Sequence, residues 1–228
     1  MSPPPARGSP PSGAGKPQLS RERPEADIKL GSTNLNPPGL SLLELVREDL
    51  RTHDDDPLSL GFWALAVHRF GNWRMGIRPK PVRAPFSVLY KALSKGVQIA
   101  CGVEMDYTIK IGRHVKIWHV GALILAAQEI GEGTHIRGNC VVGKNRTDDP
   151  RWWRPIIEER VEIAAGAVIA GAIRIGHDSI IGANAVVLED VPPWSLVVGV
   201  PARILRRKDA PPLEETHGAR GNGTSTSA

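Results

Sequence analysis

The 228-residue chain has only two cysteines, Cys101 and Cys140. Two thiols cannot form a disulfide framework or a zinc ribbon, so the sequence predicts a protein of a reducing compartment, which by default is the cytoplasm. The chain also lacks an apolar run long enough for a signal peptide or a membrane span, and membrane insertion is therefore not expected.

A concentrated basic stripe with interleaved aromatic residues is missing as well, although the formal net charge is +5. Nucleic-acid-binding proteins usually show such a stripe, so no nucleic-acid partner is expected. The basic residues are scattered except for one cluster, formed by Arg203, Arg206, Arg207 and Lys208. Charge alone leaves open whether this cluster meets a phosphorylated small ligand or belongs to a solvated tail.

Both ends of the chain are poor in apolar residues. Residues 1–36 and 206–228 are rich in Pro, Gly, Ser and charge, and we predict that both are disordered tails. The part between them is long enough for one domain. We expect a helical subdomain over residues 37–106, followed by a β domain over residues 107–205.

Three helices are predicted in the first part. The first, over residues 40–53, starts with the capping-box pair Ser41 and Glu44 and continues as an apolar stripe. The second runs from residue 61 to residue 75, and its aromatic residues are expected to pack in the core. The third has Pro85 in its first turn and ends at Gly102.

A strict six-residue repeat organises the second part. An aliphatic residue occupies each register position: Ile111, Ile117, Leu123, Ile130, Ile136, Val142, Ile157, Ile163, Ile169, Ile175, Ile181 and Val187. A period of six suits a prism in which each short strand sends one aliphatic side chain inward before the chain turns. Three hexapeptides make one coil, which predicts about four stacked coils. The long interruption, residues 143–156, is expected to project as a loop.

His119 lies at the third position of its hexapeptide, which is a corner of the prism. The same threading brings Gly138, Ala165 and Ala183 to this corner in the following coils. A line of small side chains leaves a shallow outer groove in which a long, flexible ligand with the shape of a pantetheine arm could lie. A single histidine of this kind is, by itself, more often a solvated corner residue.

Metal and thiol chemistry are not expected. His114, His135 and His177 fall at different positions of their hexapeptides, so they do not cluster as zinc ligands. Cys140 lies at a small-residue position, and no histidine is spaced to serve as its base.

From about residue 43 to residue 205 the chain resembles serine O-acetyltransferases and related hexapeptide acyltransferases. The resemblance rests on four segments, VREDLRTHDDDP, FWALAVHRFGNW, KIGRHVKIWHVGALI and IGANAVVLEDVPPWSLVVGVPARIL. It implies a left-handed parallel β-helix preceded by a small α-helical domain. It also implies a homotrimer or a dimer of trimers, with active sites between adjacent prisms.

The resemblance further implies direct transfer of acetyl from acetyl-CoA to a hydroxyl, without a covalent enzyme intermediate. His119 matches the family's catalytic histidine, which takes the hydroxyl proton and returns a proton to the leaving thiolate. Asp56 matches the acceptor-binding carboxylate. Arg203 and Lys208, beside the closing segment, are candidates for contacts with the CoA phosphates.

The chain departs from the family at two places. Trp118 stands where the family has the Asp directly before its histidine, and Trp153 and Arg154 stand where it has an Arg-His pair. Arg154 could hold an anionic group or be a solvated loop charge. Trp153 and its neighbour Trp152 could stack on a sugar, cap the acceptor pocket or pack on a neighbouring subunit.

Three hypotheses remain open at this point. The first is an O-acetyltransferase acting on a sugar or exopolysaccharide precursor, since relatives with altered acceptor residues are associated with exopolysaccharide synthesis. The second is a true serine O-acetyltransferase that feeds cysteine synthesis. The third is a catalytically inactive scaffold.

Overall fold

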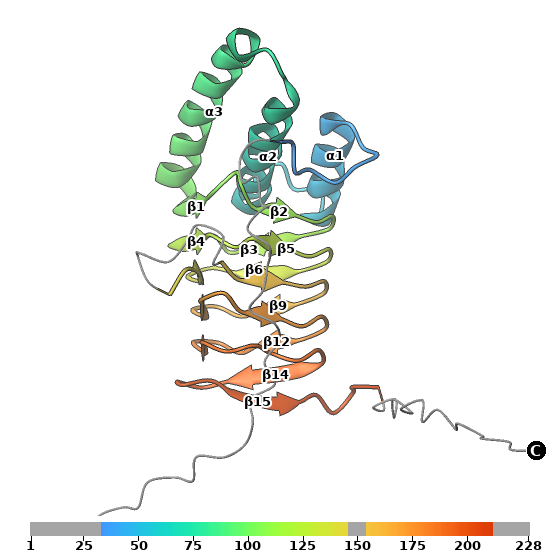
Figure 1. The fold of residues 1–228 in the computed structure, drawn as a ribbon, viewed down its shortest axis with the longest axis vertical. Helices are drawn as coiled ribbons and strands as arrows, with labels where there is room; N and C mark the ends of the chain where they lie inside the picture. Colours follow the sequence, from blue (N-terminus) through green and yellow to red (C-terminus); the bar gives the residue numbers. More distant parts are fainter. Residues whose placement is uncertain (1–32, 146–153, 212–228) are drawn as a thin grey trace, which may run out of the picture.

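The computed structural model describes residues 33–145 and 154–211, which form an α-helical cap on one end of a β-solenoid (Figure 1). The cap contains α1 (Leu42–Thr52), α2 (Leu60–Trp73), the short 3-10 helix η2 (Arg74–Gly76) and α3 (Lys80–Cys101). No helix in these two ranges is both long and apolar enough to cross a membrane.

The helix ends follow from local sequence, with one correction. Ser41 and Glu44 form the predicted capping box, and Gly102 ends α3 in the left-handed conformation. The predicted start of the third helix is wrong, because α3 begins at Lys80 and Pro85 lies inside it. Pro81 occupies the first turn, where a missing N–H costs nothing, whereas Pro85 removes one intrahelical hydrogen bond.

The solenoid consists of three sheets whose strands come from successive coils. The first sheet contains β1 (Val103–Met105), β4 (Leu123–Leu125), β7 (Val141–Gly143), β10 (Val168–Ala170) and β13 (Val186–Val187). The second contains β2 (Lys110–Ile111), β5 (Glu129–Ile130), β8 (Ile156–Ile157) and β11 (Arg174–Ile175). The third contains β3 (Lys116–Trp118), β6 (His135–Arg137), β9 (Glu162–Ile163), β12 (Ile180–Ile181), β14 (Ser195–Val198) and β15 (Arg203–Arg206).

Neighbouring strands within each sheet are parallel, except β14 and β15, which are antiparallel. The solenoid has five strands in its first sheet, one coil more than the sequence predicts. The additional strands lie at both ends of the repeat, whose twelve register positions run from β2 to β13: β1 precedes them, and the Val191 bridge and β14 follow them. The solenoid starts at Val103, ahead of the predicted boundary at residue 107, because β1 pairs with β4.

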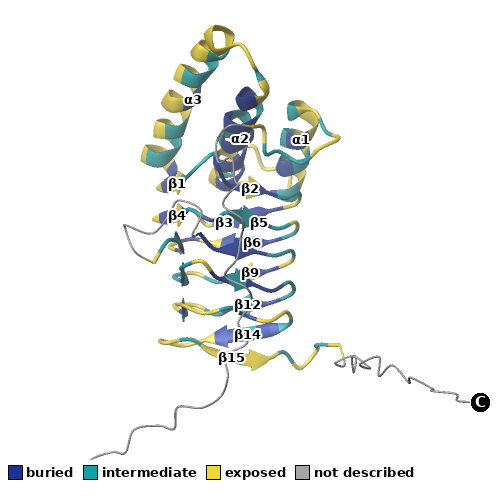
Figure 2. Cartoon of the chain, in the orientation of Figure 1, coloured by how far each residue is buried: buried dark blue, intermediate teal, exposed yellow. Residues whose placement is uncertain are grey.

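The predicted aliphatic column is confirmed. Every one of its register positions is at most 3 % exposed, and the buried residues form one cluster along the prism (Figure 2). Each coil pairs its backbone with its neighbours and covers their apolar side chains, so the coils stabilise one another.

The cap is attached to the first coil through a buried ion pair. Arg69 in α2 donates to the Asp49 carboxylate of α1 and to the carbonyl oxygens of Ile111 and Gly112. Both charged side chains are completely buried. Removing one partner of such a pair would leave an uncompensated charge in the interior.

Both predicted tails, 1–36 and 206–228, include residues that the structure shows packed against the folded part of the chain. Asn36 donates through its side-chain amide to the Arg69 carbonyl oxygen, so the chain is already packed against α2 at this point. Arg206 ends β15, and the next residue, Arg207, donates to the Asp178 carbonyl oxygen and lies over the Trp194 ring. The remaining parts of the tails, 1–32 and 212–228, lie outside the described residues.

Candidate active site

The predicted corner line is present in the structure. Trp118 pairs with Arg137, Ile136 with Ile163, and Ile163 with Ile181. Continuing each pairing to the corner places four residues in one line, His119, Gly138, Ala165 and Ala183. His119 is exposed and adopts a left-handed backbone conformation (φ 46°) directly after β3.

Gly138 has a packing role in this line. It is buried, and a Cβ at this position would lie far closer than 3.0 Å to the His119 carbonyl oxygen. Only glycine lets the backbone of the second coil pass directly beneath the histidine. Ala165 and Ala183 are exposed and form the outer part of the corner.

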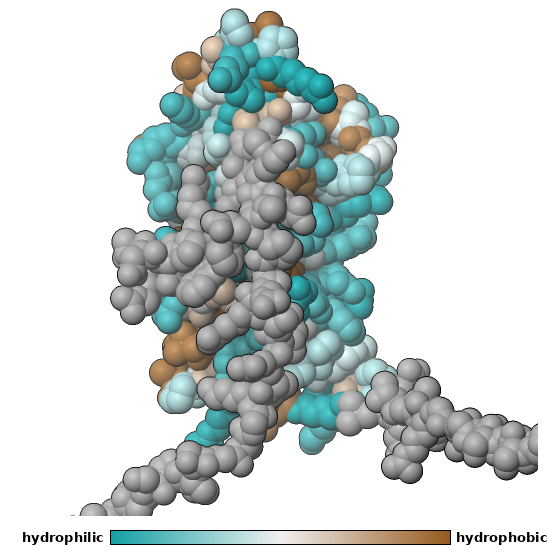
Figure 3. Space-filling model, in the orientation of Figure 1, coloured by the Kyte–Doolittle hydropathy of each residue, from teal (hydrophilic) through white to brown (hydrophobic). Residues whose placement is uncertain are grey.

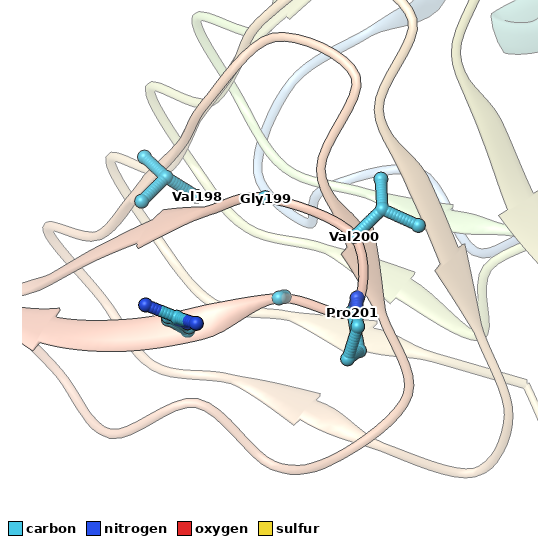
Figure 4. A pocket seen from close by; sticks show the side chains of 6 residues that line it. Val198, Gly199, Val200 and Pro201 are labelled. Carbon is cyan, nitrogen blue, oxygen red and sulfur yellow. The ribbon is translucent and has the colours of Figure 1, made fainter. Parts of the chain in front are cut away.

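The corner line leads to a shallow pocket at the far end of the solenoid. Ile181 pairs with Val197, which places Gly199 next in the line after Ala183. Residues 198–203, which include Arg203, line this open pocket of about 430 Å³. Figure 4 shows it with Val198, Gly199, Val200 and Pro201 labelled. Four inter-coil steps of about 4.8 Å separate His119 from this pocket, a distance of about 19 Å. Lys208 is exposed and is not among the residues that line it.

A tryptophan lies beside the histidine, and a lysine–aspartate pair packs against the tryptophan. The Trp118 and His119 ring centroids are 6.3 Å apart, and the two rings are tilted by 41°. The Lys116 ammonium lies 3.8 Å from the Trp118 ring centroid and 2.7 Å from the Asp54 carboxylate. The lysine side chain is 9 % exposed and the aspartate side chain is 74 % exposed.

The helical cap holds the strand that carries these residues. Buried His53, which follows α1, accepts a hydrogen bond at Nε2 from the Ile117 N–H, and its Nδ1 donates to the Asp49 carbonyl oxygen. These two bonds define a neutral imidazole with its proton on Nδ1. Burial lowers the pKa of His53 below its ordinary value, which keeps the ring neutral.

Asp56 lies in the loop between α1 and α2, two residues after Asp54. The carboxylate is exposed, and its Oδ1 accepts a hydrogen bond from the Leu58 N–H. Asp54 and Asp55 in the same loop both adopt positive φ angles of 61° and 54°. Two successive non-glycine residues in this region are strained, which is a feature that clusters at functional sites.

Arg154 lies apart from the corner line and already has partners within the chain. It is buried and donates to the Thr108 hydroxyl and the Asp106 carboxylate, both at 3.1 Å. Burial would raise the pKa of Asp106, but hydrogen bonds from Thr108 and Arg154 outweigh it and hold the pKa below its ordinary value. The view of Arg154 as a solvated loop charge is therefore wrong, and its role as an acceptor ligand loses support. Trp152 and Trp153 lie outside the described residues.

Thiol and metal chemistry receive no support from the geometry. The Cys140 thiol is buried, and burial raises its pKa, which disfavours the reactive thiolate. Across residues 33–145 and 154–211, no three His, Cys, Asp or Glu side chains converge in a way that could hold a metal ion.

Comparisons with known proteins identify the family of this chain. A model of the family described as bacterial transferase hexapeptide (six repeats) matches residues 154–189. A Helicobacter pylori serine acetyltransferase is 37 % identical, and the match covers 73 % of this chain and 99 % of that protein. The chain belongs to the serine acetyltransferase family of hexapeptide-repeat acyltransferases.

Other relatives are longer. The match to the Mycobacterium tuberculosis serine acetyltransferase is 34 % identical and covers 67 % of this chain but only 63 % of that enzyme. Among solved structures, the Vibrio cholerae serine acetyltransferase superposes with a TM-score of 0.62 at 27 % identity, covering 74 % of this chain and 67 % of that one. The soybean enzyme gives a TM-score of 0.60 at 30 % identity, with 72 % and 69 % covered. The solenoid is thus the left-handed parallel β-helix that the resemblance implied.

The sequence identified the corner line but missed the network beside it. His53, Asp54 and Lys116 were not singled out, because their contacts join residues more than sixty positions apart. The run HDDDP between two predicted helices was the available signal, since three successive carboxylates after a helix are more than a turn requires.

Proposed function

We propose that this chain transfers acetyl from acetyl-CoA to the hydroxyl of a small acceptor, with His119 as general base. One observation carries the proposal, the exposed imidazole at the head of a small-residue corner line that ends in the pocket containing Arg203. The length of the line suits an extended pantetheine arm, with the thioester at His119 and the phosphates near Arg203 and Lys208.

The reaction needs only proton transfers from the protein. The neutral imidazole of His119 takes the acceptor hydroxyl proton while the oxygen attacks the thioester carbonyl carbon. The C–S bond then breaks, and the imidazolium returns the proton to the thiolate. General-base catalysis of this kind contributes about 10²- to 10⁴-fold in rate.

A second copy of the chain is part of the proposal. Ile124, Val141, Val168 and Val186 occupy successive coils of the first sheet and point outward in register. Ile124 is 42 % exposed and Val141 38 % exposed, and apolar surface is visible on this flank of the solenoid (Figure 3). The His119 corner joins β3 to this sheet, so a subunit packed on it would stand beside the histidine. This geometry supports the predicted trimer, or dimer of trimers, with active sites between prisms.

Two acceptor classes are supported by different observations. Trp118 at the position of the family's Asp, together with the internal pairing of Arg154, favours a sugar or exopolysaccharide precursor. The names of the relatives favour L-serine. An inactive scaffold has no requirement for an exposed histidine at the head of a line of small residues, and is the weakest of the three.

The test is thiol release from acetyl-CoA by the purified chain, with L-serine and a panel of sugars and nucleotide sugars as acceptors. His119→Ala is expected to lower the rate by about 10²- to 10⁴-fold with its best acceptor. His114→Ala is the matched control, because His114 is also an exposed corner histidine with a positive φ of 55°. Equal losses in both variants would remove His119 from the mechanism. No release with any acceptor, and no acetyl-CoA binding, would favour the scaffold.

A further inference from the structure

Trp118 is the aromatic side chain that the structure places beside the proposed base. It is the last residue of β3, and it immediately precedes His119. Its ring is partly exposed, and its centroid lies 6.3 Å from the centroid of the imidazole. A ligand resting on the indole would therefore have its nearest substituents within reach of the imidazole.

Two contacts, with Lys116 and with His135, hold the indole in its orientation. The buried Lys116 ammonium packs 3.8 Å from the ring centroid and is itself held by Asp54 at 2.7 Å. The Trp118 and His135 rings form a T-shaped pair, with their centroids 6.1 Å apart and their planes at 68°. The lysine lies over one face of the indole, and Trp118 as a whole remains partly exposed. The result is a preorganised flat surface, which costs little ordering when a ligand binds.

Exposed carboxylates lie in the loop that holds Lys116. The Asp54 side chain is 74 % exposed, and Asp56 lies exposed in the same loop. Ionised carboxylates accept hydrogen bonds from hydroxyl groups, whereas an indole face packs against C–H groups. A pyranose ring presents both, since it has an apolar C–H face and a ring of hydroxyls. L-serine has no face that could stack on an indole.

We infer that Trp118 is a stacking platform that selects a carbohydrate as the acceptor. This inference rests on the proposed acetyl transfer and names its substrate class. Lys116 acts as a positioning residue that holds the indole in place. The acceptor hydroxyl that reacts is the one that the stacked ring directs toward His119.

The experiment compares the wild type with Trp118→Ala and Trp118→Phe. Initial rates are measured with methyl pyranosides of several configurations and with L-serine, and the KM of each acceptor is determined separately from that of acetyl-CoA. Trp194→Ala is the matched control, because Trp194 is also partly exposed and packs against a cation, Arg207, at the far end of the solenoid. Circular dichroism and melting curves verify that the variants fold.

We expect Trp118→Ala to raise the KM for the preferred pyranoside by about tenfold, from the loss of one aromatic contact. Trp118→Phe should retain most of the affinity because it keeps an aromatic face, and Trp194→Ala should change nothing. The KM for acetyl-CoA should stay within twofold of the wild type. A pyranoside KM that is unchanged in Trp118→Ala would overturn the inference, as would a wild type that acetylates L-serine but no pyranoside.

A binding measurement separates this inference from the proposed function. Saturation-transfer NMR with the same methyl pyranosides requires no catalysis and can be carried out on every variant. If no acceptor is acetylated but pyranoside binding is present in the wild type and lost in Trp118→Ala, the platform stands and the acetyl transfer fails. If no pyranoside binds the wild type, the platform is refuted whatever the activity with other acceptors.

Discussion

Replacing Gly138 by alanine would displace the proposed base without touching any side chain that contacts substrate. The added Cβ would lie far inside the 3.0 Å limit that Cβ contacts essentially never cross, against the carbonyl oxygen of His119. Neither partner is a flexible side-chain end, so one backbone must move. No positive φ is recorded for Gly138, which means that the alanine itself is conformationally allowed and that the clash alone decides the outcome.

The size of the effect follows from this clash. Relieving it requires a shift of about 1 Å at the corner, and a misplacement of that size can cost about 100-fold in rate. Overpacking a well-packed site destabilises a protein by about 1–3 kcal/mol. For a chain of this size, each kcal/mol corresponds to about 2–4 °C in the melting temperature. We therefore expect a large loss of kcat in a protein that still folds.

Gly143→Ala is the matched control. Gly143 lies in the same coil, but among the described residues a Cβ there would meet only the Ala126 Cβ at 3.8 Å, an ordinary van der Waals distance. Thiol release from acetyl-CoA and thermal melts are compared for both variants and the wild type. A fully active Gly138→Ala variant would refute the reasoning, because the position of His119 would then not limit the reaction. Equal losses in both variants would point to a general weakening of the solenoid.

Two further predictions concern the groove and the cap. Ala183→Trp is expected to raise the KM for acetyl-CoA by tenfold or more, because Ala183 is exposed in the corner line and the indole would fill the groove. The melting temperature should change little. Ala84→Trp, at an exposed position of α3, is the control, and equal KM values in the two variants would contradict the groove. Burial lowers the pKa of His68 to about 3, so the unfolded chain takes up a proton first as the pH falls below 6.5. Stability should then fall by about 1.4 kcal/mol per pH unit from this residue, with a further loss from His53. Urea unfolding between pH 7.5 and 5.0 measures the slope, which His68→Gln should reduce; an unchanged slope would show that His68 does not titrate in this way.

The solenoid could be predicted because its sequence repeats. Each hexapeptide places one aliphatic side chain inward, so a strict period fixes the register of every coil, and with it the corner that contains His119. The strands outside the repeat show where this reasoning ends. Val103–Met105 pairs with β4 and begins the solenoid without a hexapeptide of its own. Pairing with the next coil, and not the local pattern, makes this segment a strand.

Contacts between distant segments could not be predicted in the same way. Arg154 was open to two interpretations because a loop arginine has many potential partners, and the carboxylate that it meets, Asp106, is 48 positions away in the sequence. The same applies to Lys116 and Asp54, which are 62 positions apart. Charge pairs of this kind depend on how the cap is placed on the solenoid, which no repeat specifies.

The placement of the cap explains why the site is complete only with its helices. β3 is the outermost strand of its sheet, so the Ile117 N–H has no neighbouring coil to accept its hydrogen bond. His53 supplies the acceptor, and α2 approaches the Ile117 carbonyl so closely at Gly61 that no side chain would fit. An unsatisfied N–H at this edge would cost stability and leave the strand loose two residues before His119. The cap therefore acts as the missing coil, and it fixes the backbone from which the imidazole and the indole of Trp118 project.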